Sequence, residues 1–211
     1  MRSTRIKVCG FTREADLDGA LVLGIDAVGF VLYPPSPRAV SIERAAVLAA
    51  RVPPFVTRVG LFVNEAAEAV ERAVRGAALD CLQFHGDETP AECERFALPY
   101  IKAVRVRPGL DLLEYARQFR GARALLLDAY SDSWGGSGKS FDWSLIPPDL
   151  PLPVILSGGL NPENVAEAVK FSRPAAVDVS SGVESSKGIK DVAKVAAFIS
   201  GVENGEVRPA D

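Results

Sequence analysis

Histidine, cysteine and long apolar runs are scarce in this chain of 211 residues, which has one histidine and three cysteines. The cysteines, Cys9, Cys81 and Cys93, are odd in number and lack metal-ligand spacing. We therefore expect no disulfide framework, no metal site and no cofactor. Charge is also balanced, with a net value of -3, so the composition gives no reason to expect a nucleic-acid or membrane partner.

The N-terminal residues Met1–Arg5 run directly into a strand-like segment, without an apolar leader. A cytoplasmic location is therefore expected. Hydrophobic residues make up 48% of the chain and charged residues 24%, which is enough to bury a core. We expect a single domain over 1–211, in which 202–211, rich in Glu, Asn, Gly and Pro, forms a loose tail.

Short β-rich runs recur along the chain and alternate with segments of helical spacing. The runs are Arg5–Cys9, Asp26–Leu32, Thr57–Val63, Asp80–Phe84, Tyr100–Val106, Arg123–Asp128, Val154–Ser157 and Ala176–Ser180. Strands that are apolar almost throughout are covered on both faces, which indicates a parallel sheet wrapped in helices. Eight even repeats favour a closed (β/α)8 barrel, a TIM barrel, over the alternative of an open doubly wound sheet. In the sixth repeat, Phe141–Leu145 predicts only a short or irregular helix.

Two strand-to-glycine turns near the C-terminus predict an anion site. Strand Val154–Leu156 runs into Ser157, Gly158 and Gly159, and strand Ala176–Val179 runs into Ser180, Ser181 and Gly182. Glycines leave backbone N–H groups free to converge on an anion. This is where strands 7 and 8 of a (β/α)8 barrel bind phosphate, so we expect a small phosphorylated molecule as the partner.

The working residues of such a barrel stand at the C-terminal ends of its strands. Cys9 ends the first strand, and Lys7, two residues earlier, points to the same side, where its charge would favour a thiolate. Asp128 ends the sixth strand after an apolar run, with little nearby protein to stabilise its charge. Burial there would favour the protonated form, as a general acid requires. The alternative for Cys9 is a buried, unreactive thiol, and the alternative for Asp128 is a structural carboxylate in a turn.

Other polar residues occupy comparable positions. Asp178 lies among valines in the last strand and would neighbour Lys7 once the barrel closes, so a structural ion pair is expected first and a catalytic role second. Arg38 lies in a proline-rich loop that would pre-organise its guanidinium for a carboxylate, unless it is a solvated surface arginine. His85 either contributes a hydrogen bond or closes the fourth strand.

The segment Gly135–Ser140 has the glycines of a phosphate loop, but Ser133 stands where the Walker A motif requires glycine. No long helix follows it either. A loop that closes over the ligand is the better interpretation, with Trp134 as an apolar lid.

These segments, taken in order along the chain, are also the basis of a resemblance. They are Lys7–Thr12, Gly29–Val31 with Ser36–Arg38, Gln83–Gly86, Leu127–Asp128 with Gly135–Trp143, Ser157–Asn164 and Asp178–Glu184. Over about Lys7 to Ile199 they resemble the phosphoribosylanthranilate isomerase family of tryptophan biosynthesis.

The resemblance implies a cofactor-free (β/α)8 barrel that converts N-(5-phosphoribosyl)anthranilate to 1-(2-carboxyphenylamino)-1-deoxyribulose 5-phosphate by an Amadori rearrangement. We expect a monomer or a homodimer. The resemblance also implies that Cys9 is the general base and Asp128 the general acid, that Arg38 faces the anthranilate carboxylate, and that the glycine turns hold the phosphate. Pro35 departs from the basic residue often found there.

Two rival functions remain at this point. A histidine-pathway or dual-substrate isomerase would use the same barrel, with an aspartate in place of Cys9 and a second phosphate site. A barrel that only binds a phosphorylated ligand would account for the glycine turns but not for Cys9 and Asp128.

Overall fold

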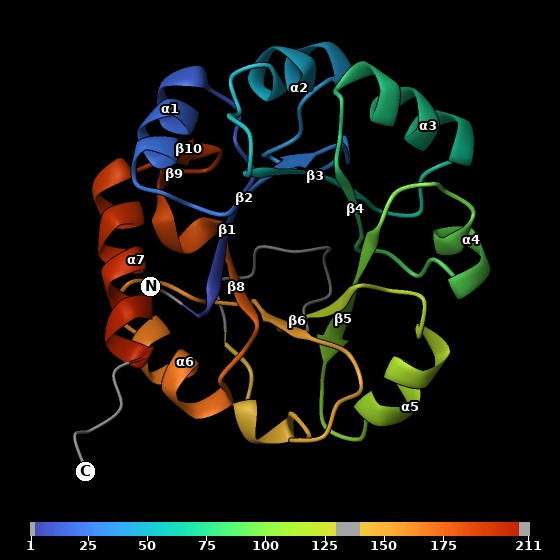
Figure 1. The fold of residues 1–211 in the computed structure, drawn as a ribbon, viewed down its shortest axis with the longest axis vertical. Helices are drawn as coiled ribbons and strands as arrows, with labels where there is room; N and C mark the ends of the chain where they lie inside the picture. Colours follow the sequence, from blue (N-terminus) through green and yellow to red (C-terminus); the bar gives the residue numbers. More distant parts are fainter. Residues whose placement is uncertain (1–2, 130–139, 207–211) are drawn as a thin grey trace.

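The structure is a computed structural model that describes residues 3–129 and 140–206. Eight parallel strands close a barrel in the order β1 to β8, with β8 paired to β1 (Figure 1). The strands are β1 (Arg5–Cys9), β2 (Ala27–Val31), β3 (Thr57–Phe62), β4 (Cys81–Phe84), β5 (Tyr100–Val106), β6 (Ala124–Ala129), β7 (Val154–Leu156) and β8 (Ala176–Val179). The prediction of a closed barrel is confirmed.

Helices surround the barrel on its outside (Figure 1). They are α1 (Glu14–Val22), α2 (Ile42–Ala49), α3 (Ala67–Gly76), α4 (Pro90–Glu94), α5 (Leu112–Gln118), α6 (Val165–Ser172) and α7 (Val192–Glu206). Between β6 and β7 the described residues hold only the 3-10 turn η1 (Trp143–Leu145), as expected for the sixth repeat. After β8 come the 3-10 turn η2 (Ser181–Val183) and the hairpin β9 (Glu184–Ser186) and β10 (Ile189–Lys190).

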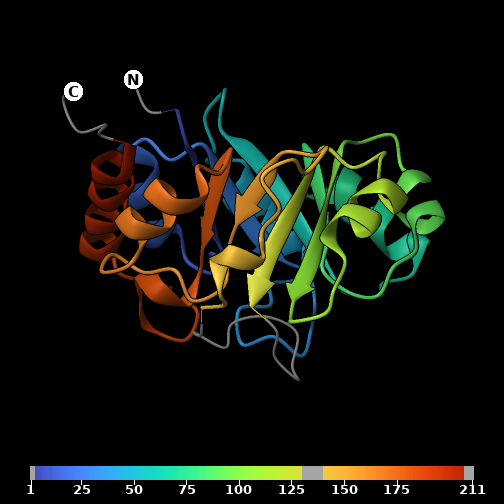
Figure 2. The ribbon, with the colours of Figure 1, turned by 90° about the horizontal axis from the view of Figure 1, so that it is seen from below.

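Successive side chains of each strand face opposite sides of the sheet. In β6, Leu125 and Leu127 pack in the main core, whereas Ala124 and Leu126 belong to a separate apolar cluster. Asp128 continues that second set at the end of the strand. The eight barrel strands are all parallel, and Figure 2 shows the arrowheads of β5 and β6 at the same end of the barrel. Polar residues that end different strands are therefore brought together there.

The C-terminal segment is more ordered than its composition predicts. Helix α7 continues to Glu206, and Val202 is fully buried on the same face as Phe198 and Ile199. Glu206 Oε1 accepts hydrogen bonds from the backbone N–H and the hydroxyl of Ser3, at 2.9 and 3.0 Å. The prediction of a loose tail is thus wrong for 202–206, because buried apolar residues at helical spacing hold this segment in α7 despite its polar residues. Residues 207–211 lie outside the described residues.

Within the described residues, none of the helices combines the length and the apolar character needed to cross a membrane.

Candidate active site

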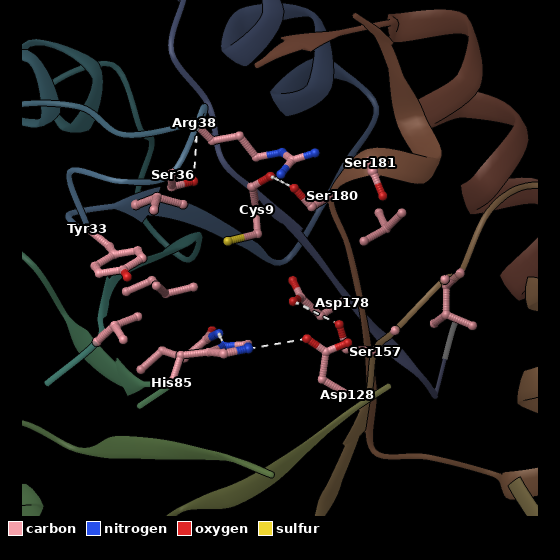
Figure 3. A pocket seen from close by; sticks show the side chains of 18 residues that line it. Cys9, Tyr33, Ser36, Arg38, His85, Asp128, Ser157, Asp178, Ser180 and Ser181 are labelled. Carbon is pink, nitrogen blue, oxygen red and sulfur yellow. Dashed lines mark hydrogen bonds and ion pairs between the residues drawn. The ribbon is translucent and has the colours of Figure 1, made fainter. Parts of the chain in front are cut away.

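A cavity opens where the strands end. Cys9, His85 and Asp128 surround the same space, although they come from β1, the end of β4 and β6 (Figure 3). The predicted site residues that line it are Cys9, Arg38, His85, Asp128, Gly158, Gly159, Asp178, Ser180 and Ser181. Lys7 and Gly182 do not line it. The expected acid and base therefore share one hollow.

Lys7 and Asp178 form a buried ion pair at the cavity, of which only Asp178 lines the cavity wall. They are register partners across the junction that closes the barrel, and Lys7 Nζ lies 2.8 Å from Asp178 Oδ1. Burial opposes the charge of Lys7, but Asp178 and Cys9 outweigh it and raise the pKa of Lys7. Ser157 Oγ donates to the other oxygen of Asp178 at 3.3 Å. The expected structural pairing is present.

The Cys9 thiol is buried at the cavity wall, with 4% of the residue exposed. Burial is the largest influence and raises the pKa of this thiol, and Asp178 adds to the effect. Lys7 and Lys190 lower it, but they do not reverse the direction. Lys7 thus favours the thiolate, as expected, but burial outweighs it, so the net pKa of the thiol is raised.

Asp128 has a partner that was not anticipated. Its Oδ2 lies 3.2 Å from Nε2 of His85, and Gln83 Nε2 lies 3.0 Å from the other ring nitrogen, Nδ1. Oδ1 of Asp128 accepts from the N–H of Ala129 at 2.8 Å. The expectation that this carboxyl has little protein around it is wrong. The contacts were missed because β4 and β6 are not neighbours in the barrel.

Arg38 is buried and its guanidinium is already paired. Nε and Nη2 bind the two carboxylate oxygens of Glu184 at 2.7 and 2.8 Å, a bidentate pair that raises the pKa of Arg38. Lys190 Nζ lies 2.8 Å from the same carboxylate. Although burial opposes the charge of Glu184, Arg38 and Lys190 lower the pKa of that carboxyl. The solvated surface arginine is thereby ruled out.

Neither Glu184 nor Lys190 was singled out from the sequence. Glu184 lies 146 residues from Arg38 along the chain, and both acidic and basic residues are common in surface hairpins such as β9–β10. No sequence spacing therefore predicts the contact between Arg38 and Glu184. The contact forms only because closure of the barrel brings the hairpin after β8 next to the loop after β2.

The glycine turns have the geometry of an anion site. Gly158 and Gly159 have φ angles of +77° and +66°. No acceptor among the described residues binds the backbone N–H groups of Gly158, Gly159 or Ser181. Gly182 has a structural role. A Cβ at this position would lie 2.0 Å from the carbonyl oxygen of Leu160, so the absence of a side chain lets the two turns pack together.

Two sequence-based predictions concern other parts of the site. Trp134 and nearly all of the predicted closing loop fall in 130–139, outside the described residues, so the closing loop stays a prediction. Over the ranges 3–129 and 140–206, no three His, Cys, Asp or Glu side chains are grouped to hold a metal ion.

The fold and the site define a (β/α)8 barrel in which a carboxyl group and a thiol face one cavity beside two glycine turns, as in barrels that act on small phosphorylated molecules. A family model described as "N-(5'phosphoribosyl)anthranilate (PRA) isomerase" matches residues 6–201. The chain belongs to this family.

Curated and solved relatives agree with this assignment. The N-(5'-phosphoribosyl)anthranilate isomerase of Dechloromonas aromatica is 59% identical over 203 residues, which cover 96% of this chain and 98% of the relative. The phosphoribosyl anthranilate isomerase structure from Thermotoga maritima has a TM-score of 0.89 at 43% identity, covering 95% and 98% of the two chains. Another structure of this isomerase, in complex with reduced 1-(o-carboxyphenylamino)-1-deoxyribulose 5-phosphate, has a TM-score of 0.85 at 41% identity and the same coverage.

Proposed function

We propose that this chain catalyses the Amadori rearrangement of N-(5'-phosphoribosyl)anthranilate to 1-(2-carboxyphenylamino)-1-deoxyribulose 5-phosphate, a step of tryptophan biosynthesis. The observation that carries the proposal is the shared cavity, in which Cys9 and Asp128 stand together beside the glycine turns and Arg38. The molecule bound in the related complex carries a phosphate and a carboxylate, the two anionic groups that these residues suit.

Substrate binding uses the two ends of the cavity. The phosphate binds the N–H groups of Gly158, Gly159 and Ser181, which have no acceptor among the described residues. The anthranilate carboxylate binds Arg38. Glu184 occupies Nε and Nη2, and no other described residue pairs with the guanidinium, so Nη1 and the remaining Nη2 hydrogen can bind a second carboxylate. Glu184 fixes the guanidinium plane and leaves that edge free.

Two proton transfers complete the isomerisation. Asp128 gives a proton to the furanose ring oxygen, the C1–O bond breaks, and the ring opens to a Schiff base. Cys9, as thiolate, removes the proton from C2 to give an enolamine, which tautomerises to the ketone. Since burial raises the pKa of the Cys9 thiol, the base becomes more abundant as the pH rises.

The test is turnover of the phosphoribosyl substrate by the purified protein and its variants. Cys9→Ser and Asp128→Asn should each lower kcat by about 100- to 10,000-fold. Both should retain affinity for inorganic phosphate, whereas Cys81→Ala, at a buried thiol outside the cavity lining, should keep wild-type turnover.

Three outcomes would contradict the proposal. Full activity of Asp128→Asn or Cys9→Ser would exclude the role assigned to that residue. Phosphate binding without any turnover would indicate a barrel that only binds its ligand. Comparable turnover of a histidine-pathway substrate would indicate the dual-substrate isomerase. The oligomeric state, monomer or homodimer, stays a prediction.

A further inference from the structure

Gln83, His85 and Asp128 form a series of hydrogen bonds in the wall of the cavity. Figure 3 shows the contact between His85 and Asp128. Gln83 and His85 are two residues apart at the end of β4 and so face the same side. Gln83 is fully buried, and the other two residues are 6% and 8% exposed. Because all three side chains are largely buried, hydrogen bonds among them decide which atoms carry the protons.

The amide group of Gln83 determines which ring nitrogen of His85 carries the proton. Its Nε2 is 3.0 Å from Nδ1, and an amide nitrogen can only donate. Nδ1 must therefore offer its lone pair. In a neutral imidazole the proton then resides on Nε2, which faces Asp128 Oδ2 at 3.2 Å. This N–H can donate to the carboxylate that Asp128 becomes when it gives up its proton.

The opposite orientation of the amide would reverse every step. Gln83 Oε1 would face Nδ1 and require a proton there, so that a neutral ring would present a lone pair to Asp128 and accept from a carboxylic acid. In the structure Gln83 Oε1 is instead buried without a hydrogen-bond partner among the described residues. The amide thus presents its N–H to Nδ1, although its own oxygen is left unsatisfied.

We infer that Gln83 is a positioning residue that fixes the tautomer of His85 with the proton on Nε2. His85 then stabilises the Asp128 carboxylate that forms when the acid gives up its proton. This inference rests on the proposed function for its catalytic meaning, because it assigns a role in the acid step. The tautomer itself can be measured without any substrate.

The sequence makes the measurement direct. His85 is the only histidine in the chain, so a protein labelled with ¹⁵N-histidine gives one pair of ring resonances. In the wild type at neutral pH we expect Nδ1 at the shift of an unprotonated nitrogen and Nε2 at that of a protonated one. A protonated Nδ1, whether in the other tautomer or in an imidazolium ring, would overturn the inference. This result requires no variant and is independent of folding defects.

Gln83→Glu replaces the hydrogen-bond donor that faces Nδ1 with an acceptor, because a carboxylate can only accept. The Nδ1 resonance should move to the protonated range, and kcat should fall about tenfold, the loss of one hydrogen bond in the transition state. Inorganic phosphate affinity should not change. Gln118→Glu makes the same chemical change at an exposed position in α5 and should alter neither property.

An Nδ1 that remains unprotonated in Gln83→Glu would show that Gln83 does not control the tautomer, and would also overturn the inference. The proposed function could fail separately: an Nε2–H tautomer in a protein that does not turn over the phosphoribosyl substrate would leave the inference about Gln83 intact and reject the reaction.

Discussion

Gly158→Ala is the substitution for which the structure gives the sharpest expectation. Gly158 has a φ angle of +77° and follows β7, next to the end of β6. A Cβ at this position would lie 2.4 Å from the backbone nitrogen of Ala129 and 2.8 Å from Oδ1 of Asp128. Since one of these neighbours is backbone, no side-chain rotation can relieve the contact. The end of β6 or the glycine turn must move.

A matched control separates the two costs of the substitution. Gly24 has the same φ of +77°, but no atom lies within 4 Å of its added Cβ. Gly24→Ala should cost roughly 1 kcal/mol, because a left-handed alanine costs about 1–2 kcal/mol and the stiffer unfolded chain returns about 0.4–1 kcal/mol. Gly158→Ala adds overpacking of about 1–3 kcal/mol, for a total of roughly 2–4 kcal/mol.

Urea denaturation measures both free energies of unfolding, and steady-state kinetics measures the effect on the site. Gly158→Ala should lower kcat at least about tenfold, because Asp128 is displaced, and should raise KM, because the anion turn moves. Gly24→Ala should leave both constants unchanged. If the two variants lost equal stability and Gly158→Ala kept wild-type kinetics, the close approach of the glycine turn to the acid would be refuted.

Three further expectations follow from the site and from α7. Glu184→Gln should raise KM with a smaller change in kcat, and should cost about 3 kcal/mol in urea denaturation, because the buried guanidinium of Arg38 loses its charged partner; an unchanged KM would mean that Glu184 does not orient Arg38. Asp178→Asn should lower the pKa of the Cys9 thiol, since the Asp178 carboxylate raises it. In a protein whose other two cysteines are replaced by alanine, Cys9 should then be alkylated faster at fixed pH. Slower alkylation would contradict this expectation. Val202→Ala should cost about 1–2 kcal/mol, because Val202 is fully buried; a loose segment would show no loss.

The pairing of Arg38 has a consequence for selectivity. A buried guanidinium held on one edge by Glu184 offers its remaining donors in a fixed plane. Lys190 adds a second cation to the same carboxylate, so the cluster of three keeps a net positive charge. A ligand without a carboxylate would leave that charge unmatched. With the proposed function, this charge is expected to select an anthranilate ring over an unsubstituted aniline.

The sequence alone determined the barrel and the positions of its working residues. Strand and helix periodicities are local properties, and the eight repeats are present in the order of the chain. Because parallel strands end at one face, Cys9, Asp128 and the glycine turns could be assigned to a common site before any coordinates were known. The pairing of Lys7 with Asp178 also followed, since closure of eight strands makes β1 and β8 neighbours.

Only the tertiary structure decided how these groups are tuned. The pKa of Cys9 is set by a balance of burial, Lys7 and Asp178 whose sign depends on distances. The partner of Arg38 comes from a hairpin far along the chain, and the contact between His85 and Asp128 spans strands that are not adjacent. Such contacts leave no periodic trace in a sequence, because electrostatic energies depend on separation in space and on exclusion of water rather than on chain spacing.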